Sequence, residues 1–304
     1  MNQSYIHTMT KRSQKRGFAL LITLSVLTVL ISLTAVLLNY FDTVRKDAVV
    51  TKAMIQGNLY YTDITKMIQS FKEKKSLFST LYMTPVPLVS PDGRFNVMIE
   101  CHPRANGVNI NWLGKENDLK WHMQFKTAQA LFEAIAQNYA LEDASRLEEM
   151  LLLQIQGKEA FVKVSNHRLL QKNGIMSFQQ FKSILQQYQF ETDDQKVSSV
   201  PWQKYFVFGD TGRLIDGDYL STELIALLFN MDKETVKAEW TAGSMKLKDF
   251  LQQMGKPYES KLYAQEFLEE VSCKVAYHYQ DEPFVFSFID TQGEVKDFEF
   301  HGKQ

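Results

Sequence analysis

The sequence has few of the residues and motifs that mark enzymes or metal proteins. Its 304 residues include two cysteines and six histidines. There is no Cys-x-x-Cys pair and no His-x-x-x-His pair, so a zinc site has no support. The chain also has neither a Gly-x-Ser-x-Gly nucleophile motif nor a glycine-rich phosphate loop. We therefore expect a protein that is not an enzyme and that holds no tightly bound cofactor.

An excess of charge of either sign is missing as well. The chain has 34 Lys and Arg against 35 Asp and Glu, which gives a formal net charge of −1. Proteins that bind nucleic acid usually carry a basic excess, so the composition indicates no nucleic-acid partner. Charged residues make up 23% and hydrophobic residues 45% of the chain, which is typical of a globular domain.

The chain does have one long apolar run, which extends from Phe18 to Leu38 without a charge, a proline or a glycine. About 20 such residues suffice for a helix to cross the core of a bilayer. Basic residues precede the run, at Lys11, Arg12, Lys15 and Arg16. Because basic flanks stay in the cytoplasm, we expect a single-pass inner-membrane protein whose C-terminal domain is periplasmic.

Three interpretations fit this run: a secretory signal, an uncleaved anchor and a pilin-type leader. A secretory signal usually has a shorter apolar core, followed by a cleavage site of small residues. The residues after Leu38 lack that site. An uncleaved anchor fits the hydropathy as well as a leader does, and the N-terminal edge of the run separates the two.

That edge reads Lys15-Arg16-Gly17-Phe18. It resembles the type III leader of type IV pilins and type II secretion pseudopilins. The resemblance implies that prepilin peptidase cuts between Gly17 and Phe18 and that the new N-terminus is methylated. Glycine leaves the bond uncluttered because it has no side chain. The family usually has Glu at the fifth position after the cut, where this chain has Ile22. In that respect the chain is similar to the K-type minor pseudopilins, whose members often lack this Glu.

Residues 39–76 continue the apolar run with helical periodicity and without proline. Apolar side chains recur at spacings near three and four: Phe41, Val44, Ala48, Ile55, Leu59, Ile64, Met67 and Phe71. The pattern predicts one continuous helix from about Phe18 to Lys75. The alternative is a bent pair of helices with a break at Gly57.

Four segments alternate apolar and polar residues as half-buried strands do. They are Arg94–Cys101, Ser272–Tyr279, Phe284–Asp290 and Glu294–Phe300. Short turn-like connections predict that the last three form an antiparallel meander. The segment before the first strand is polar and contains Pro85, Pro87 and Pro91, so we expect a loop there.

The block between these strands has a helical pattern. Apolar spacing and residues suited to capping predict five helices: Thr127–Tyr139, Leu141–Ile155, Phe178–Tyr188 capped by Ser177, Glu223–Phe229 capped by Ser221, and Asp232–Trp240 capped by Asp232. We expect a loop at Glu191–Ser199 and a short extended run at Trp202–Asp210.

Two segments of this block resemble elements of the K-type pseudopilins. Ala105–Leu113 is similar to their Asn-Leu-Asn element after the first strand. Leu214–Leu228 is similar to an element in which hydrophobic residues alternate with Asn before a helix. Here Asp216 and Asp218 stand where Asn is usual. The order of elements matches that of the family over residues 17–240.

The resemblance implies an α+β fold. A long N-terminal helix would pack on a small pilin-like antiparallel sheet of about four strands, interrupted by a large all-α insertion domain. The expected parts are a leader peptide (1–17), the transmembrane half of the helix (18–38), the outer helix and first strand (39–109), the helical insertion (110–270) and the C-terminal strands (271–304).

Two further sites follow from this architecture. Cys101 and Cys273 lie on the strands that flank the insertion, so they can pair in an oxidising compartment if those strands are neighbours; otherwise they stay free. Asp210, Asp216 and Asp218 are close in sequence, and calcium prefers such oxygen ligands at turns. The resemblance also implies calcium in the helical domain, whereas capping or turn roles are the alternative for these aspartates.

For function, the resemblance implies a minor pseudopilin at the tip of a type II secretion pseudopilus. Such a subunit primes and caps a filament built with other minor pseudopilins and their helices. One alternative is a minor pilin-like subunit of a type IV pilus or a DNA-uptake machine, which would assemble in the same way with other partners. A further alternative is an uncleaved single-span periplasmic protein of other function.

Overall fold

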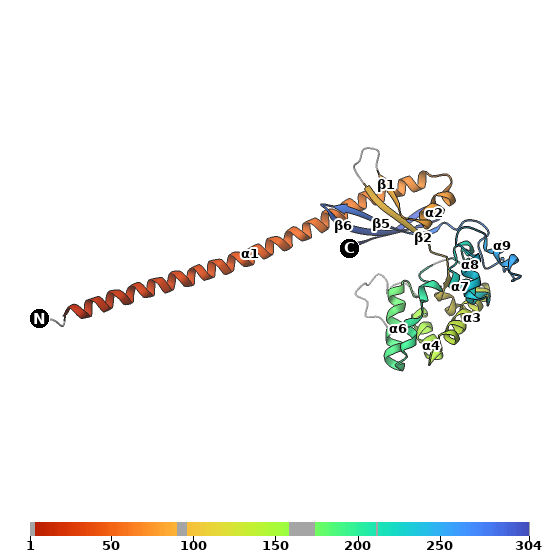
Figure 1. The fold of residues 1–304 in the computed structure, drawn as a ribbon, viewed down its shortest axis with the longest axis horizontal. Coiled ribbons are helices and arrows are strands. Elements are labelled where there is room, and N and C mark those ends of the chain that lie inside the picture. Colours follow the sequence, from red (N-terminus) through yellow and green to blue (C-terminus); the bar gives the residue numbers. More distant parts are fainter. Residues whose placement is uncertain (1–3, 90–95, 158–173, 211, 304) are drawn as a thin grey trace.

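The molecule consists of a long helical rod, a sheet and a helical insertion (Figure 1). The computed structural model describes residues 4–89, 96–157, 174–210 and 212–303. Helix α1 spans Ser4–Ser70, and its 67 residues give it a length of about 100 Å. Its N-terminal part projects away from the other elements, and its C-terminal part packs on the sheet (Figure 1). The fold is therefore α+β, with a long apolar N-terminal helix.

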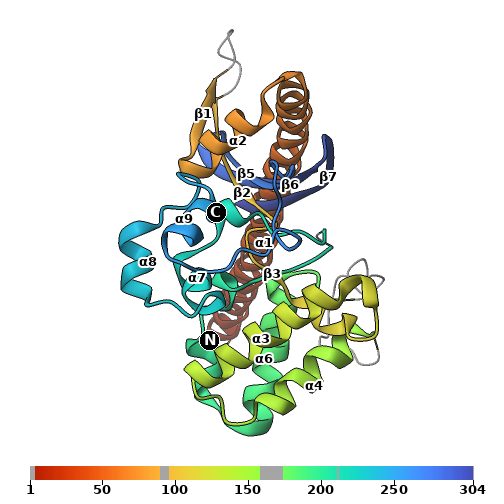
Figure 2. The same cartoon turned by 90° about the vertical axis from the view of Figure 1, so that its right-hand side faces the viewer.

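Among the described residues the sheet has five strands, one more than the four expected (Figure 2). All are antiparallel to their neighbours, in the order β1-β2-β5-β6-β7. The strands are β1 (Val86–Val89), β2 (Asn96–Pro103), β5 (Glu270–Tyr279), β6 (Glu282–Thr291) and β7 (Glu294–Lys303). The C-terminal meander is as predicted, and each strand extends a few residues beyond its predicted bounds. Two of these strands, β2 and β5, are direct neighbours although the whole insertion separates them in sequence.

One face of the sheet holds α1. The helix presents a buried row at spacings of three and four: Ala53, Gly57, Tyr60, Ile64 and Ile68. On β6, alternation sends Phe284, Phe286 and Phe288 to the same core. This contact places only the last third of the rod on the sheet and leaves residues 20–48 exposed.

The rod passes through Gly57 without a break, so the alternative of a bent helix pair is wrong. A Cβ atom at this position would lie 2.8 Å from the hydroxyl oxygen of Tyr277 on β5. That hydroxyl donates a hydrogen bond to the backbone oxygen of Ala53. The glycine therefore serves a close approach between helix and strand rather than a bend.

Two elements replace the loop expected around the prolines. Helix α2 spans Lys74–Met83, so the predicted single helix to Lys75 is wrong at its end: α1 stops at Ser70. Strand β1 follows α2 and pairs with β2 at the sheet edge. Proline is tolerated on edge strands, where no ladder bond is lost toward solvent, which explains how Pro87 lies within β1.

The insertion between β2 and β5 has a hydrophobic core of its own, distinct from that of the sheet. Its elements are β3 (Val108–Asn109), α3 (His122–Asn138), α4 (Ala144–Ile155), α6 (Phe178–Thr192), β4 (Phe206–Val207), α7 (Thr222–Leu228), α8 (Lys233–Glu239) and α9 (Leu247–Gln253). Strands β3 and β4 pair in parallel, so the expectation of an all-α insertion is wrong in this detail.

The predicted caps are confirmed. The side chains of Ser177, Ser221 and Asp232 each accept a backbone N–H three residues on and so begin α6, α7 and α8. The predicted loop at Glu191–Ser199 is wrong, because α6 runs to Thr192 and a 3₁₀ helix covers Gln195–Ser199. The predicted extended run is mostly wrong: a 3₁₀ helix forms at Trp202–Lys204, and only two residues, Phe206 and Val207, are strand.

Candidate functional site

The features with functional potential are described from the surface of the long helix inward. Within the described ranges, no three or more His, Cys, Asp and Glu side chains are placed to hold a metal ion. Four features stand out instead: the exposed apolar rod, a groove at the end of that rod, the point where the insertion leaves the sheet, and a set of buried carboxylates.

The apolar run of α1 is uncovered in the molecule. From Leu20 onward the helix is long and apolar enough to cross a membrane, and none of its most apolar window is buried. Phe18 is 67% exposed. The helix continues through Gly17 and Phe18, so the predicted cleavage bond lies inside a regular helix. Processing at Gly17 and Phe18 stays a prediction.

Beyond the run, α1 carries a second apolar stripe. Phe41, Val44, Ile55 and Leu59 are exposed, and they lie about 160° around the helix from the stripe that contacts the sheet. An amphipathic helix buries its apolar stripe. A helix with two such stripes on opposite sides can pack on its own sheet and on another helix at the same time.

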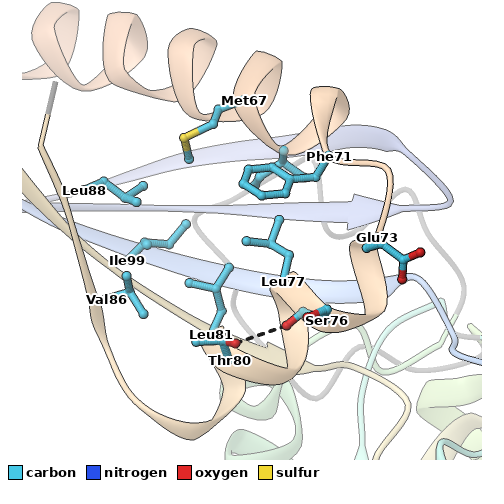
Figure 3. A pocket seen from close by; sticks show the side chains of 11 residues that line it. Met67, Phe71, Glu73, Ser76, Leu77, Thr80, Leu81, Val86, Leu88 and Ile99 are labelled. Atoms are coloured by element: carbon cyan, nitrogen blue, oxygen red, sulfur yellow. Dashed lines mark hydrogen bonds between the residues drawn. The ribbon is translucent and has the colours of Figure 1, made fainter. Parts of the chain in front are cut away.

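A groove lies where α1, α2 and β1 converge (Figure 3). Its volume is about 370 Å³, room for one or two large side chains. Met67 lines it from α1, and Phe71 lies just after the end of that helix. Leu77 and Leu81 line it from α2, and Val86 from β1. This groove was not predicted, because most of α2 and all of β1 fall in the segment that was expected to be a loop.

A disulfide bond closes the base of the insertion. Cys101 on β2 lies directly opposite Cys273 on β5, and the two form a disulfide with both residues fully buried. The register continues to Pro103 and Val271, and the N–H of Arg104 donates to the carbonyl of Glu270 at 2.9 Å. The chain thus leaves and re-enters the sheet at one point, next to the disulfide.

The structure does not bring the three calcium candidates together. Asp216 is buried, and one of its carboxylate oxygens has no hydrogen-bond partner in the part of the chain that the structure describes. Burial, and then the nearby charge of Asp218, raises its pKa to about 7. Asp218 is engaged by Lys246, with 2.6 Å between Oδ2 and Nζ. The negative charge of Asp210 instead helps to raise the pKa of Glu270. Calcium at these residues remains a prediction from sequence.

Two buried carboxylates at the end of the sheet were not predicted from the sequence. Glu270 and Asp290 are buried, and each has one oxygen without a hydrogen-bond partner among the described residues. Burial raises the pKa of both groups. The signal was present for Asp290, because it follows Phe288 by two residues and therefore lies in the apolar row of its strand.

Comparisons with known proteins leave the motif resemblance without independent support. No protein-family model matches this sequence. A search of curated proteins finds no significant match.

Proposed function

We propose that this protein is a minor pseudopilin of the K type, at the tip of a type II secretion pseudopilus. It acts there as a structural subunit that primes and caps the filament for protein export across the outer membrane. Three features support the proposal together: the Lys15-Arg16-Gly17-Phe18 edge, the rod with its uncovered apolar surface, and the insertion that leaves the sheet between neighbouring strands.

Helix α1 explains how the subunit is processed and how it enters the filament. Prepilin peptidase removes residues 1–17 on the cytoplasmic side, and the rod stays in the inner membrane with its C-terminal domain in the periplasm. The stripe at Phe41, Val44, Ile55 and Leu59 then packs against helices of other minor pseudopilins. A glutamate in the hydrocarbon layer is costly unless it is paired. A tip subunit has no neighbour above it to pair with that glutamate, so it does not need the residue. The presence of Ile22 at this position fits such a subunit.

The insertion is the observation on which the capping role depends. It lies beside the sheet, toward the end of the molecule far from the N-terminus (Figure 1). Its core is separate from that of the sheet, so it adds bulk without contributing to the sheet packing. A second subunit stacked above would meet this bulk, and growth would stop there.

Excising the insertion tests this role. Arg104 and Glu270 are hydrogen-bonded across neighbouring antiparallel strands, so residues 105–269 can be replaced by Asn-Gly, which favours a two-residue hairpin turn. Because Ile22 by itself suits only a tip position, the excision is combined with Ile22→Glu. We expect this variant to be processed and to join filaments along their length instead of at one end. The Cys101–Cys273 disulfide reports whether the sheet still folds. A variant that folds and still occupies only the tip would contradict the capping role.

Deleting the gene separates export from the alternatives. We expect loss of secreted proteins from the medium with unchanged DNA uptake. Loss of DNA uptake or of surface pili with normal export would instead assign the chain to a type IV pilus or transformation machine. Recovery of an unprocessed protein from cells would favour the uncleaved single-span alternative.

A further inference from the structure

The insertion is tied to the sheet by two chain crossings that lie side by side. Strand β2 ends at Pro103 and β5 begins at Glu270, and the N–H of Arg104 donates to the carbonyl of Glu270 at 2.9 Å. A further contact, from the N–H of Gly212 to a carboxylate oxygen of Glu270 at 3.3 Å, lies at the same point. Because the insertion and the sheet have separate hydrophobic cores, the insertion can rotate about this point without disturbing either core.

The hydrogen bonds and the two cores show where each crossing changes from one body to the other. On the entering side, the carbonyl of Ala105 accepts the N–H of Asp216 at 2.8 Å, so Ala105 already belongs to the insertion. On the returning side, Tyr263 lies in the insertion core and Phe267 packs against the sheet core. The pivot therefore lies just before Ala105 on one side and at the exposed residues 265–266 on the other.

Away from the crossings, Tyr219 fastens the insertion to α2. Its hydroxyl lies 2.9 Å from that of Ser79, and its ring meets that of Tyr82 edge-on, with 4.9 Å between their centres. Helix α2 belongs to the sheet side, because its residues Phe78 and Leu81 are buried in the sheet core. One aromatic side chain of the insertion therefore bridges the two bodies.

This closed joint leaves a polar group unsatisfied. The hydroxyl of Tyr82 is buried and has no hydrogen-bond partner within the described ranges. Burial, and then the charges of Asp216 and Tyr219 in the insertion, raises the pKa of Tyr82 above its usual range. A buried polar group without a partner costs free energy, whereas a hydrogen bond that water can replace contributes little. The bond between Ser79 and Tyr219 is thus opposed by the unpaired hydroxyl, which gains water partners when the joint opens.

We propose that the insertion is a hinged body and that Tyr219 is the contact that holds it closed against α2. When this contact breaks, the insertion swings about the crossings, and Ser79, Tyr82 and Tyr219 become accessible to solvent. The disulfide between Cys101 and Cys273 lies in the sheet next to the pivot and keeps β2 and β5 together as the insertion moves. The hinge is independent of whether the chain belongs to the pseudopilins.

Electron-spin distance measurements test the hinge. Spin labels are attached at Lys66→Cys on α1 and Lys237→Cys on α8, both exposed positions, in the unreduced full chain in detergent micelles. We expect a closed population and a second one with a different distance. Tyr219→Phe removes the bond to Ser79 and should raise the open-to-closed ratio by about fivefold. Tyr219→Ala also removes the ring contact and should raise the ratio further.

Two more variants separate a hinge from a general loss of structure. Tyr82→Phe removes the unpaired hydroxyl, so it should lower the open-to-closed ratio by about fivefold. Tyr139→Phe removes a matched hydroxyl, 2.9 Å from that of Tyr205 within the insertion, and should leave the ratio unchanged. One distance distribution shared by all variants, a higher ratio in Tyr82→Phe, or equal shifts in Tyr139→Phe and Tyr219→Phe would overturn the proposal.

Discussion

The hydroxyl of Tyr277 reaches the backbone of α1 beside Gly57. It donates to the carbonyl of Ala53, and a Cβ atom on Gly57 would lie 2.8 Å from the hydroxyl oxygen. The rings of Tyr277 and Tyr60 also meet edge-on, with 5.3 Å between their centres. This contact sets the distance between α1 and the sheet.

Gly57→Ala should therefore destabilise the protein although alanine favours helices. The higher helix propensity of alanine stabilises the folded state by about 1 kcal/mol, whereas the steric overlap with Tyr277 costs roughly 1–3 kcal/mol. We therefore expect a lower midpoint of thermal unfolding. Tyr277→Phe removes the atom that clashes, and Gly57→Ala should cost less in that background. Equal costs in both backgrounds, or stabilisation by Gly57→Ala alone, would show that the contact does not govern the packing.

The disulfide between Cys101 and Cys273 joins residues 172 positions apart. A bond that closes so long a loop stabilises by roughly 2–5 kcal/mol, mainly by constraining the unfolded chain. We expect no alkylatable thiol in denatured, unreduced protein and two after reduction. The Cys101→Ala/Cys273→Ala variant should unfold at a lower temperature. Two free thiols before reduction would rule out the bond in the cell.

Asp216 should make stability depend on pH. Its pKa is raised from 3.8 to about 7, first by burial and then by Asp218. The folded state therefore holds the proton more tightly, so this contribution is fully present below about pH 4 and is lost as the pH rises through about 7. Asp216→Asn should remove a pH-dependent change in the free energy of unfolding on the order of 2–4 kcal/mol. At pH 8 the variant should be more stable than the wild type. Unfolding midpoints of wild type and variant that run parallel from pH 4 to 8 would contradict this assignment.

The outward stripe of α1 should bind other helices. Ile55 is 58% exposed, so Ile55→Asp should change the stability of the subunit by less than about 0.5 kcal/mol. The new charge would be buried in the interface with other helices, so it should abolish co-purification with other minor pseudopilins from membranes. Asn58→Asp adds the same charge to a neighbouring exposed position and serves as the control. Co-purification that survives in Ile55→Asp, or fails equally in Asn58→Asp, would move the interface elsewhere.

Regular patterns in the sequence predicted the elements that bury one face. Alternation located β2 and the C-terminal meander, and the capping residues Ser177, Ser221 and Asp232 marked helix starts. The edge strand β1 was missed because four residues that include Pro87 resemble a loop until a neighbouring strand pairs with them. Helix α2 was missed because Lys74 and Lys75 were taken as the end of the long helix, and the rest of α2 lies directly before the prolines and was taken as a loop.

The candidate site was less predictable than the fold. Two cysteines leave pairing open until the strand register places Cys101 opposite Cys273. Three nearby aspartates suggest a calcium site until Lys246 is seen to engage Asp218. The position of Asp290 in a core row was readable from its strand, but the burial of Glu270 depends on tertiary packing that the sequence pattern does not reveal.

The most direct measurement is the intact mass of the protein purified from membranes of its own cells. Cleavage by prepilin peptidase predicts a chain that begins at Phe18, carries one methyl group and lacks residues 1–17. A chain that still contains Met1 to Gly17 would contradict the account, because the rod would then be an ordinary anchor and could not enter a pseudopilus.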